Sequence, residues 1–225
     1  MPGSVQWKIA MMAAVAAAFC VGQSAPNPDP QAKDAQAQMK GLTPRASAAD
    51  YQAQAKAGTV TIAAEFDAHA VSTPEGIYST EDYVAVEVAF FGEGDMPLRL
   101  AQGDFSIRIN GKPMPSPAEP YARIFPSLKD LEWEPPASAS KAGKTSLGGG
   151  GQDLNAPPPA PPKMPFELKR AMQQKVQKAA LPEGDRPLPV AGLIFFPYRG
   201  KADGIRTVEL MYEGAAGKAT LALHP

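Results

Sequence analysis

The sequence predicts a mainly β protein: an antiparallel β-sandwich with one inserted helix and disordered N-terminal and internal linkers. Two observations carry the sandwich prediction. Apolar residues alternate with polar ones over several segments, which is typical of strands that bury one face. Turn residues separate these segments, and strands do not alternate regularly with helices, which favours an antiparallel sandwich over a parallel α/β sheet.

The first half of the predicted sandwich contains three segments with a period of two, at residues 60–69, 81–91 and 105–109. Asn110-Gly111 follows the third and predicts a hairpin turn, because both residues tolerate a positive φ. Residues 121–125 are expected to form a further short strand. The side chains that we expect to be almost fully buried are Val86, Phe90, Phe105, Ile107, Phe195 and Leu210.

The second half begins with a predicted helix over residues 165–181, in which Leu168, Met172 and Val176 recur every four positions. Its apolar side suits it to cover an edge of the sandwich. Its polar side carries Lys169, Arg170, Lys175 and Lys178, which form either a solvated face or a contact with an anionic membrane or an acidic partner.

Three more strands follow this helix. Residues 193–198 are apolar on both faces, as expected of a central strand, and residues 205–212 and 218–224 read as a closing hairpin.

Low-complexity segments frame these elements. Residues 25–57 are rich in Ala, Gln and Pro and predict a disordered tether, and residues 135–163 hold four consecutive glycines and the run APPPAPP. The predicted organisation is a signal peptide at 1–24, the tether at 25–57, the two parts of the sandwich at 58–134 and 183–225, a flexible insertion at 135–163 and the helix at 164–182.

The N-terminus predicts export. Residues 9–22 are uniformly apolar after Lys8, as in a secretory signal peptide, and the run is too short to span a bilayer comfortably. We therefore expect a periplasmic or extracellular protein that contacts a membrane only through its uncleaved leader. Cys20, the single cysteine, lies within that leader, so cleavage beyond it leaves no thiol. Lipidation of Cys20 is the alternative, and the bulky Phe19 argues against it.

Charge limits the choice of partners. The formal net charge is −1, which leaves no broad basic field of the kind that nucleic-acid binding needs. The expected partner is an envelope protein or a glycan, and no nucleic acid.

Two segments resemble a known family. DYVAVEVAFFGEGDMPLRLAQGDFSIRINGK, at residues 82–112, is similar to a recurring part of bacterial extracytoplasmic immunoglobulin-like sandwiches, in which a long strand leads through a turn to an Asp-Phe pair that opens the next strand. PLPVAGLIFFPYRGKADGIRTVELMY, at residues 187–212, resembles their later half. The resemblance covers about half of the chain and implies that the β-sandwich is immunoglobulin-like and belongs to an exported protein. That family is mostly of unknown function and supplies no catalytic residues.

Aromatic residues before the Pro/Gly-rich insertion are the candidate contact site. Trp133, Tyr121 and Phe125 either stack on a sugar or grip a peptide, or they form a satellite cluster that closes the bottom of the sandwich.

Other constellations point to no catalytic, cofactor or metal site. Glu65, Asp67 and His69 alternate along one strand and are either a metal-binding set or simply a solvated face. Residues 138–145 miss the phosphate-loop pattern by one residue and have no strand before them. No Gly-x-Ser-x-Gly elbow is present, and His69 and His224 are the only histidines.

We therefore expect an exported non-enzymatic domain with an interaction or structural role at the cell envelope. A carbohydrate- or small-molecule-binding module is the alternative.

Overall fold

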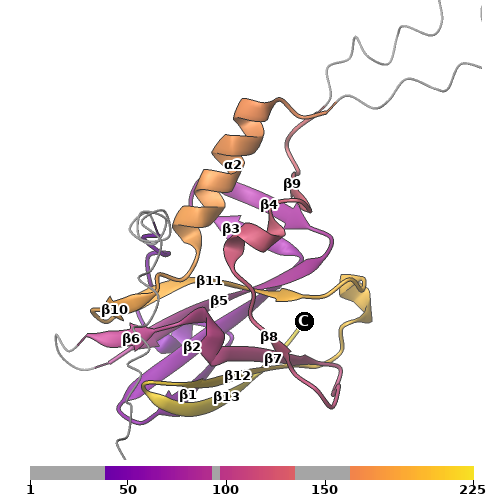
Figure 1. Ribbon diagram of the computed structural model, residues 1–225. Helices are drawn as coiled ribbons and strands as arrows, with labels where there is room; N and C mark the ends of the chain where they lie inside the picture. Colours follow the sequence, from indigo (N-terminus) through magenta and orange to yellow (C-terminus); the bar gives the residue numbers. More distant parts are fainter. Residues whose placement is uncertain (1–38, 93–96, 135–162) are drawn as a thin grey trace, which may run out of the picture.

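The computed structural model describes residues 39–92, 97–134 and 163–225 (Figure 1). The strands of these residues form four antiparallel sheets, and one α-helix accompanies them. This confirms the mainly β class that the alternating segments predict. The predicted signal peptide with Cys20, and residues 135–162 of the predicted insertion, lie outside the described residues.

Two four-stranded sheets form the body of the protein. The first large sheet has the order β1 (Ala53–Ala57), β2 (Val60–Ala68), β5 (Tyr83–Phe91) and β11 (Val190–Pro197). The second large sheet has the order β13 (Gly217–Leu223), β12 (Val208–Gly214), β7 (Phe105–Ile109) and β8 (Ser116–Pro117). The predicted hairpin at the end of the chain is confirmed, because β12 pairs with β13 along its whole length.

Smaller elements surround the two large sheets. A three-stranded sheet contains β3 (Ala70–Thr73), β4 (Gly76–Thr80) and β9 (Leu128–Asp130), and β10 (Gly184–Arg186) pairs with β6 (Leu98–Leu100). The helix α2 spans Phe166–Ala179. Short 3₁₀ turns complete the chain: η1 (Ala48–Asp50), η2 (Gln102–Asp104), η3 (Tyr121–Ile124) and η5 (Ala202–Gly204). The short strand expected at residues 121–125 is therefore wrong, since that segment turns as η3.

The main core contains residues from both large sheets. Alternate side chains of β2 and β5 join those of β7, β12 and β13 in one buried cluster. The six side chains predicted to be almost fully buried are all at most 1% exposed: Val86, Phe90, Phe105, Ile107, Phe195 and Leu210. The period of two therefore gives the correct inward face for these strands.

A second core lies on the opposite face of the first large sheet. There Met172 and Val176 of α2 pack with Phe195 of β11 and Tyr78 of β4. In Figure 1, α2 and the three-stranded sheet accordingly lie on the side of β5 and β11 that faces away from β12 and β13. The start of α2 differs from expectation, because Leu168, expected on its apolar side, is 50% exposed, and Phe166 before it is 73% exposed.

Strand β11 is the last strand of its sheet, so its predicted central position is wrong. Its apolar character has another cause, since α2 covers one face and the main core covers the other. Its open edge is also covered, because three segments each donate one backbone N–H to alternate carbonyl groups. These bonds run from Leu42 to Ala191, from Leu181 to Leu193 and from Glu119 to Phe195. Covering an edge in this way prevents pairing with other chains.

Residues 39–57 pack against the protein, so the predicted tether is wrong for this part of residues 25–57. Met39 and Tyr51 are buried, and β1 pairs with β2. The backbone N–H of Gly41 also donates to the carbonyl of Lys178 at the end of α2. A few anchoring residues thus order a segment whose composition is poor in large apolar side chains.

Arg45 fastens this segment to the outer face of the first large sheet. Its guanidinium pairs with Glu65 and lies 3.5 Å from Glu87, two residues that stand opposite each other on β2 and β5. The same group lies 4.6 Å from the centre of the Tyr51 ring. One cation therefore neutralises part of an acidic surface that also includes Asp67.

Asp67 makes stability depend on pH. It sits at the irregularity between Phe66 and Ala68, where the pairing of β2 with β5 shifts, and its Oδ2 is buried without a hydrogen bond within the described residues. Burial raises the pKa of the Asp67 carboxyl from 3.8 to about 6, and the charges of Glu87 and Glu65 act in the same direction. The folded state thus holds this proton more tightly than the unfolded state, so stability falls as the pH rises from about 4 to about 6.

We predict that Asp67→Asn, which removes the ionisation, stabilises the protein at pH 7.5 by about 1–2 kcal/mol. This figure discounts the full linkage value because the side chain is partly exposed. Urea unfolding at pH 4 and pH 7.5 checks it: the gain should be present at pH 7.5 and nearly absent at pH 4. An equal gain at both pH values would contradict ionisation of Asp67 as the cause.

Candidate functional site

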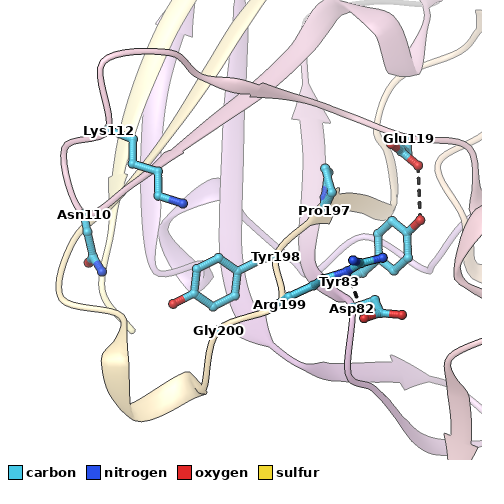
Figure 2. A pocket seen from close by; sticks show the side chains of 9 residues that line it. All are labelled: Asp82, Tyr83, Asn110, Lys112, Glu119, Pro197, Tyr198, Arg199 and Gly200. Atoms are coloured by element: carbon cyan, nitrogen blue, oxygen red, sulfur yellow. Dashed lines mark hydrogen bonds and ion pairs between the residues drawn. The ribbon is translucent and has the colours of Figure 1, made fainter.

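A cleft of about 610 Å³ opens where four separate segments of the chain meet (Figure 2). Its lining residues are Asp82, Tyr83, Asn110, Lys112, Glu119, Pro197, Tyr198, Arg199 and Gly200. Tyr83 begins β5, and its register partner on β11 is Pro197, so Tyr198 and Arg199 emerge beside it. Glu119 reaches the cleft because its backbone pairs with Phe195 of β11.

The turn after β7 brings Asn110 and Lys112 to the same cleft. Asn110 and Gly111 have φ values of 54° and 64°, and the N–H of Lys112 donates to the carbonyl of Ile109. The turn predicted at Asn110-Gly111 is therefore confirmed, but it does not close a tight two-residue hairpin. The strands that it joins, β7 and β8, pair only at Ser106–Pro117 and Ile107–Ser116, which leaves a long loop at the mouth of the cleft.

Asn110 joins this turn to the loop that follows β11. Its side-chain Nδ2 donates to the carbonyl of Gly204, and its Oδ1 accepts the backbone N–H groups of Arg206 and Thr207. Its backbone N–H donates to the carbonyl of Thr207. With so many bonds within the protein, Asn110 serves to position the two loops.

Tyr83 and Glu119 form a polar wall on the other side of the cleft, and Arg123, which does not line the cleft, contacts Glu119. The Tyr83 hydroxyl donates to Oε2 of Glu119 over 3.2 Å, and Nε of Arg123 lies 3.7 Å from the same oxygen. Burial raises the pKa of the Tyr83 hydroxyl, and the neighbouring Glu119 carboxylate raises it further. Tyr83 therefore stays protonated and remains a hydrogen-bond donor. Figure 2 shows this pair apart from Tyr198, Asn110 and Lys112.

Tyr198 and Lys112 form the opposite wall. Tyr198 is half-buried, and Nζ of Lys112 lies 5.9 Å from the centre of its ring. Lys112 forms no ion pair with any part of the chain that the structure describes. Arg199, in contrast, lies with its Nε 3.3 Å from Oδ1 of Asp82.

His69 lies behind the lining of the cleft and contacts two of its backbone carbonyl groups. Its Nδ1 lies 2.7 Å from the carbonyl oxygen of Tyr83, and its Nε2 lies 2.7 Å from that of Gly200. A carbonyl oxygen only accepts, so both contacts are hydrogen bonds when both ring nitrogens carry a hydrogen. The imidazole also lies against Tyr198, with ring centres 5.9 Å apart. His69 thus connects three residues that line the cleft.

Glu65, Asp67 and His69, the residues that the sequence offered as a metal-binding set, do not come together in the structure. Ala68 has a φ of 49°, and the strand irregularity at Asp67 breaks the alternation that would keep Glu65 and His69 on one face. Glu65 pairs with Arg45 on the outer face of the first large sheet, whereas His69 binds Tyr83 and Gly200. No group of three metal-ligating side chains occurs in the described ranges.

The aromatic residues expected to form a contact site are only partly brought together. Tyr121 and Phe125 lie with ring centres 5.8 Å apart and pack against the second core. Trp133 is half-buried, and it belongs neither to the residues packed on the three buried clusters nor to those that line the cleft.

The sequence alone does not identify Tyr83, Tyr198 and Lys112 as candidate site residues. The available signal is a tyrosine at the end of a strand, followed by Arg199 and Gly200.

Comparison of the chain with protein-family models, with curated proteins and with solved structures finds no match. None of the helices in the described ranges has the length and apolar character needed to cross a bilayer.

Proposed function

We propose that this chain is an exported, non-enzymatic binding domain that acts at the cell envelope, and that a carbohydrate or comparable small polar ligand occupies the cleft. One observation carries the proposal. Three segments far apart in the sequence supply two tyrosines and a lysine to one open cleft of about 610 Å³, and this lysine forms no ion pair within the described residues. A volume of this size suits a small ligand, and polar groups set among aromatic surfaces are typical of such sites.

The side chains of the cleft favour binding over catalysis. Its two carboxylates are already engaged, Asp82 by Arg199 and Glu119 by Tyr83 and Arg123. His69 lies behind the lining with both ring nitrogens directed at carbonyl groups. General acid–base catalysis needs a group that can exchange a proton with the ligand, and these interactions direct the candidates elsewhere.

A tyrosine ring and hydroxyl-binding groups suit a sugar. An aromatic ring offers an apolar surface to the C–H face of a pyranose, and amide, hydroxyl and charged side chains bind its hydroxyl groups. Tyr198 supplies the ring, and Lys112 and Arg199 supply donors beside it.

A β-sandwich is the architecture we propose for the two large sheets, and the shared core between them supports it. The order β13-β12-β7 also resembles one sheet of an immunoglobulin-like domain. The first large sheet departs from that pattern, because β2 pairs with the next long strand, β5, rather than with a later one. The proposed relation to immunoglobulin-like domains rests on the second sheet.

A glycan array tests the function. The full chain without its leader should bind to at least one immobilised saccharide. Tyr198→Ala should lower the apparent affinity for that saccharide at least about tenfold. Tyr121→Ala is the matched control, since it removes a half-buried tyrosine outside the cleft. Thermal unfolding followed by circular dichroism confirms that both variants are folded.

Three outcomes of this array are decisive. Binding to a saccharide that is weakened by Tyr198→Ala and not by Tyr121→Ala supports the cleft as the binding site. Binding that is weakened by Tyr121→Ala and not by Tyr198→Ala places the site at the aromatic pair Tyr121 and Phe125. This outcome contradicts the cleft as the binding site. If the protein binds to no saccharide on the array, the proposal of carbohydrate binding is overturned.

A further inference from the structure

We infer that the ligand of the cleft is an acidic saccharide, in which a carboxylate on the sugar reaches Lys112 while the sugar ring lies against Tyr198. This inference rests on the proposed function, because it names the class of ligand for the same site. It arises from an uneven distribution of charge around the mouth of the cleft.

Cations gather on the side of the cleft formed by two loops. One loop follows β7 and supplies Lys112, and the other follows β11. The cations of the second loop are Arg199, Lys201 and Arg206, and all of these side chains are exposed. The bonds of Asn110 to Gly204, Arg206 and Thr207 hold the two loops side by side. Four positive charges from separate segments therefore lie at one end of the molecule.

Few acidic groups oppose these four cations. Asp203 lies within the second loop, Asp82 pairs with Arg199, and Glu119 of the cleft pairs with Arg123, so the sum that includes Arg123 and all three carboxylates is 5 − 3 = +2. The whole chain has a formal net charge of −1. Among the described residues, Lys112, Lys201 and Arg206 form no ion pair. A local excess of positive charge on a chain that is negative overall attracts an anionic ligand to this end.

The position of Lys112 specifies where the anionic group of the ligand lies. Its ammonium group is 5.9 Å from the centre of the Tyr198 ring. A pyranose ring placed on Tyr198 therefore puts a carboxylate attached to that ring within reach of Lys112. An ammonium group without a carboxylate partner gains a charge-assisted hydrogen bond from such a ligand.

The opposite wall argues against a densely charged polymer. Glu119 and Asp82 line the same cleft, so a polyanion without apolar surface meets repulsion there and gains no contact with the tyrosine rings in return. A saccharide alternates apolar ring faces, hydroxyl groups and single carboxylates. This chemistry matches a wall of tyrosines and mixed charges better than a polyphosphate does.

Matched saccharides test the inference. Isothermal titration calorimetry of the leaderless full chain uses hexamers of galacturonate, glucuronate and mannuronate, each beside its fully methyl-esterified form. Esterification removes the charge and keeps the rings. We expect at least one free acid to bind about tenfold or more tightly than its ester, and this preference to shrink as sodium chloride rises from 50 to 300 mM, because salt screens exposed charges.

A charge-matched pair of variants locates the effect. Lys112→Gln should remove most of the preference for the acid, whereas Lys56→Gln, on the exposed surface of β1, should leave it unchanged. Both variants lose one positive charge, so a general effect of net charge would weaken both equally. Equal weakening would overturn the inference.

The remaining outcomes separate this inference from the function on which it rests. Equal binding of acid and ester, or Tyr198-dependent binding of neutral saccharides alone, overturns the acidic ligand and leaves the cleft as a carbohydrate site. Tighter binding of inorganic polyphosphate than of every hexamer overturns the saccharide as the preferred anion. If no saccharide binds, acidic or neutral, the proposed function fails as well.

Discussion

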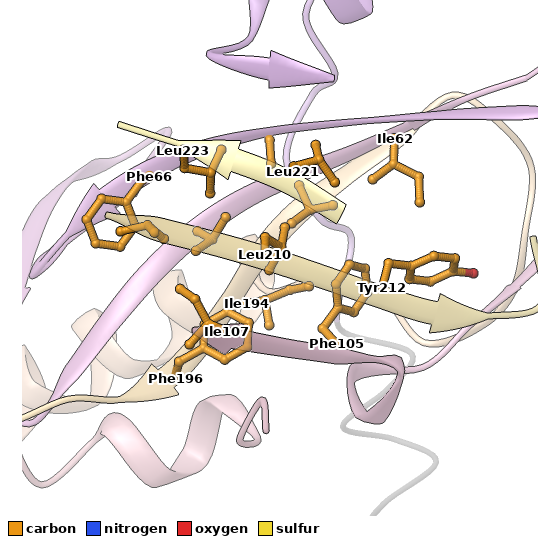
Figure 3. Close-up of a cluster of buried hydrophobic side chains, with 14 of the residues drawn as sticks. Ile62, Phe66, Phe105, Ile107, Ile194, Phe196, Leu210, Tyr212, Leu221 and Leu223 are labelled. Atoms are coloured by element: carbon orange, nitrogen blue, oxygen red, sulfur yellow. The ribbon is translucent and has the colours of Figure 1, made fainter. Parts of the chain in front are cut away.

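Phe90→Ala is expected to lower the free energy of unfolding by about 3–5 kcal/mol, the usual cost of truncating a fully buried phenylalanine. Phe90 is 0% exposed on β5. Its ring lies 6.0 Å from that of Phe105 on β7 and 5.6 Å from that of Tyr212 on β12. Figure 3 shows Phe105 and Tyr212 within this cluster. The substitution therefore opens a cavity where the two large sheets meet.

Urea denaturation followed by circular dichroism measures this loss. Phe166→Ala is the matched control, because the same truncation at a side chain that is 73% exposed should change stability by less than about 0.5 kcal/mol. A loss below about 1 kcal/mol for Phe90→Ala would contradict the packing of β5 against β7 and β12.

Gly192→Ala is expected to cost about 2–3 kcal/mol through a steric conflict. A Cβ at Gly192 would lie 2.6 Å from the backbone nitrogen of Leu181 and closer still to its Cα. Backbone atoms cannot rotate away as a side chain can, so the chain after α2 must move off β11. That movement breaks the bond from the N–H of Leu181 to the carbonyl of Leu193.

Gly103→Ala provides the control for this substitution. A Cβ at Gly103 meets no atom within 4 Å, so stability should stay within about 0.5 kcal/mol of the wild type. Hydrogen exchange adds a local measurement: in Gly192→Ala, the amide of Leu181 should lose protection. Wild-type stability and protection in Gly192→Ala would show that the helix exit does not depend on contact with β11.

The long strands can be predicted from the sequence because each buries one face. In β5, Val84, Val86, Val88 and Phe90 turn toward one core, and this alternation is visible in the sequence alone. The helix is predictable for the same reason, since Met172 and Val176 recur on its buried side.

Contacts between distant segments explain the features that the sequence does not reveal. Residues 39–57 look like a tether because they contain few large apolar residues, yet Arg45 and Met39 anchor them to groups on β2, β5 and the second core. The exposed start of α2 is a further example, because Leu168 fits the spacing of Met172 and Val176 and is nevertheless 50% exposed.

The candidate site is hidden for a related reason. Tyr83 and Tyr198 are 115 positions apart (198 − 83) and meet only because β5 pairs with β11. Lys112 joins them only because Asn110 holds its turn against the loop after β11. A sequence read locally favours Trp133, Tyr121 and Phe125, which are close together in the chain, over residues that the pairing of strands assembles.

A nuclear magnetic resonance titration with the saccharide identified on the glycan array tests most directly whether the cleft is the binding site. Shifts of the backbone amides on adding ligand report which residues surround it. The cleft predicts that the largest shifts fall in three segments, at residues 82–83, 110–112 and 198–200. Shifts concentrated instead at residues 121–133 would contradict the cleft and place binding at the aromatic residues that precede the Pro/Gly-rich segment.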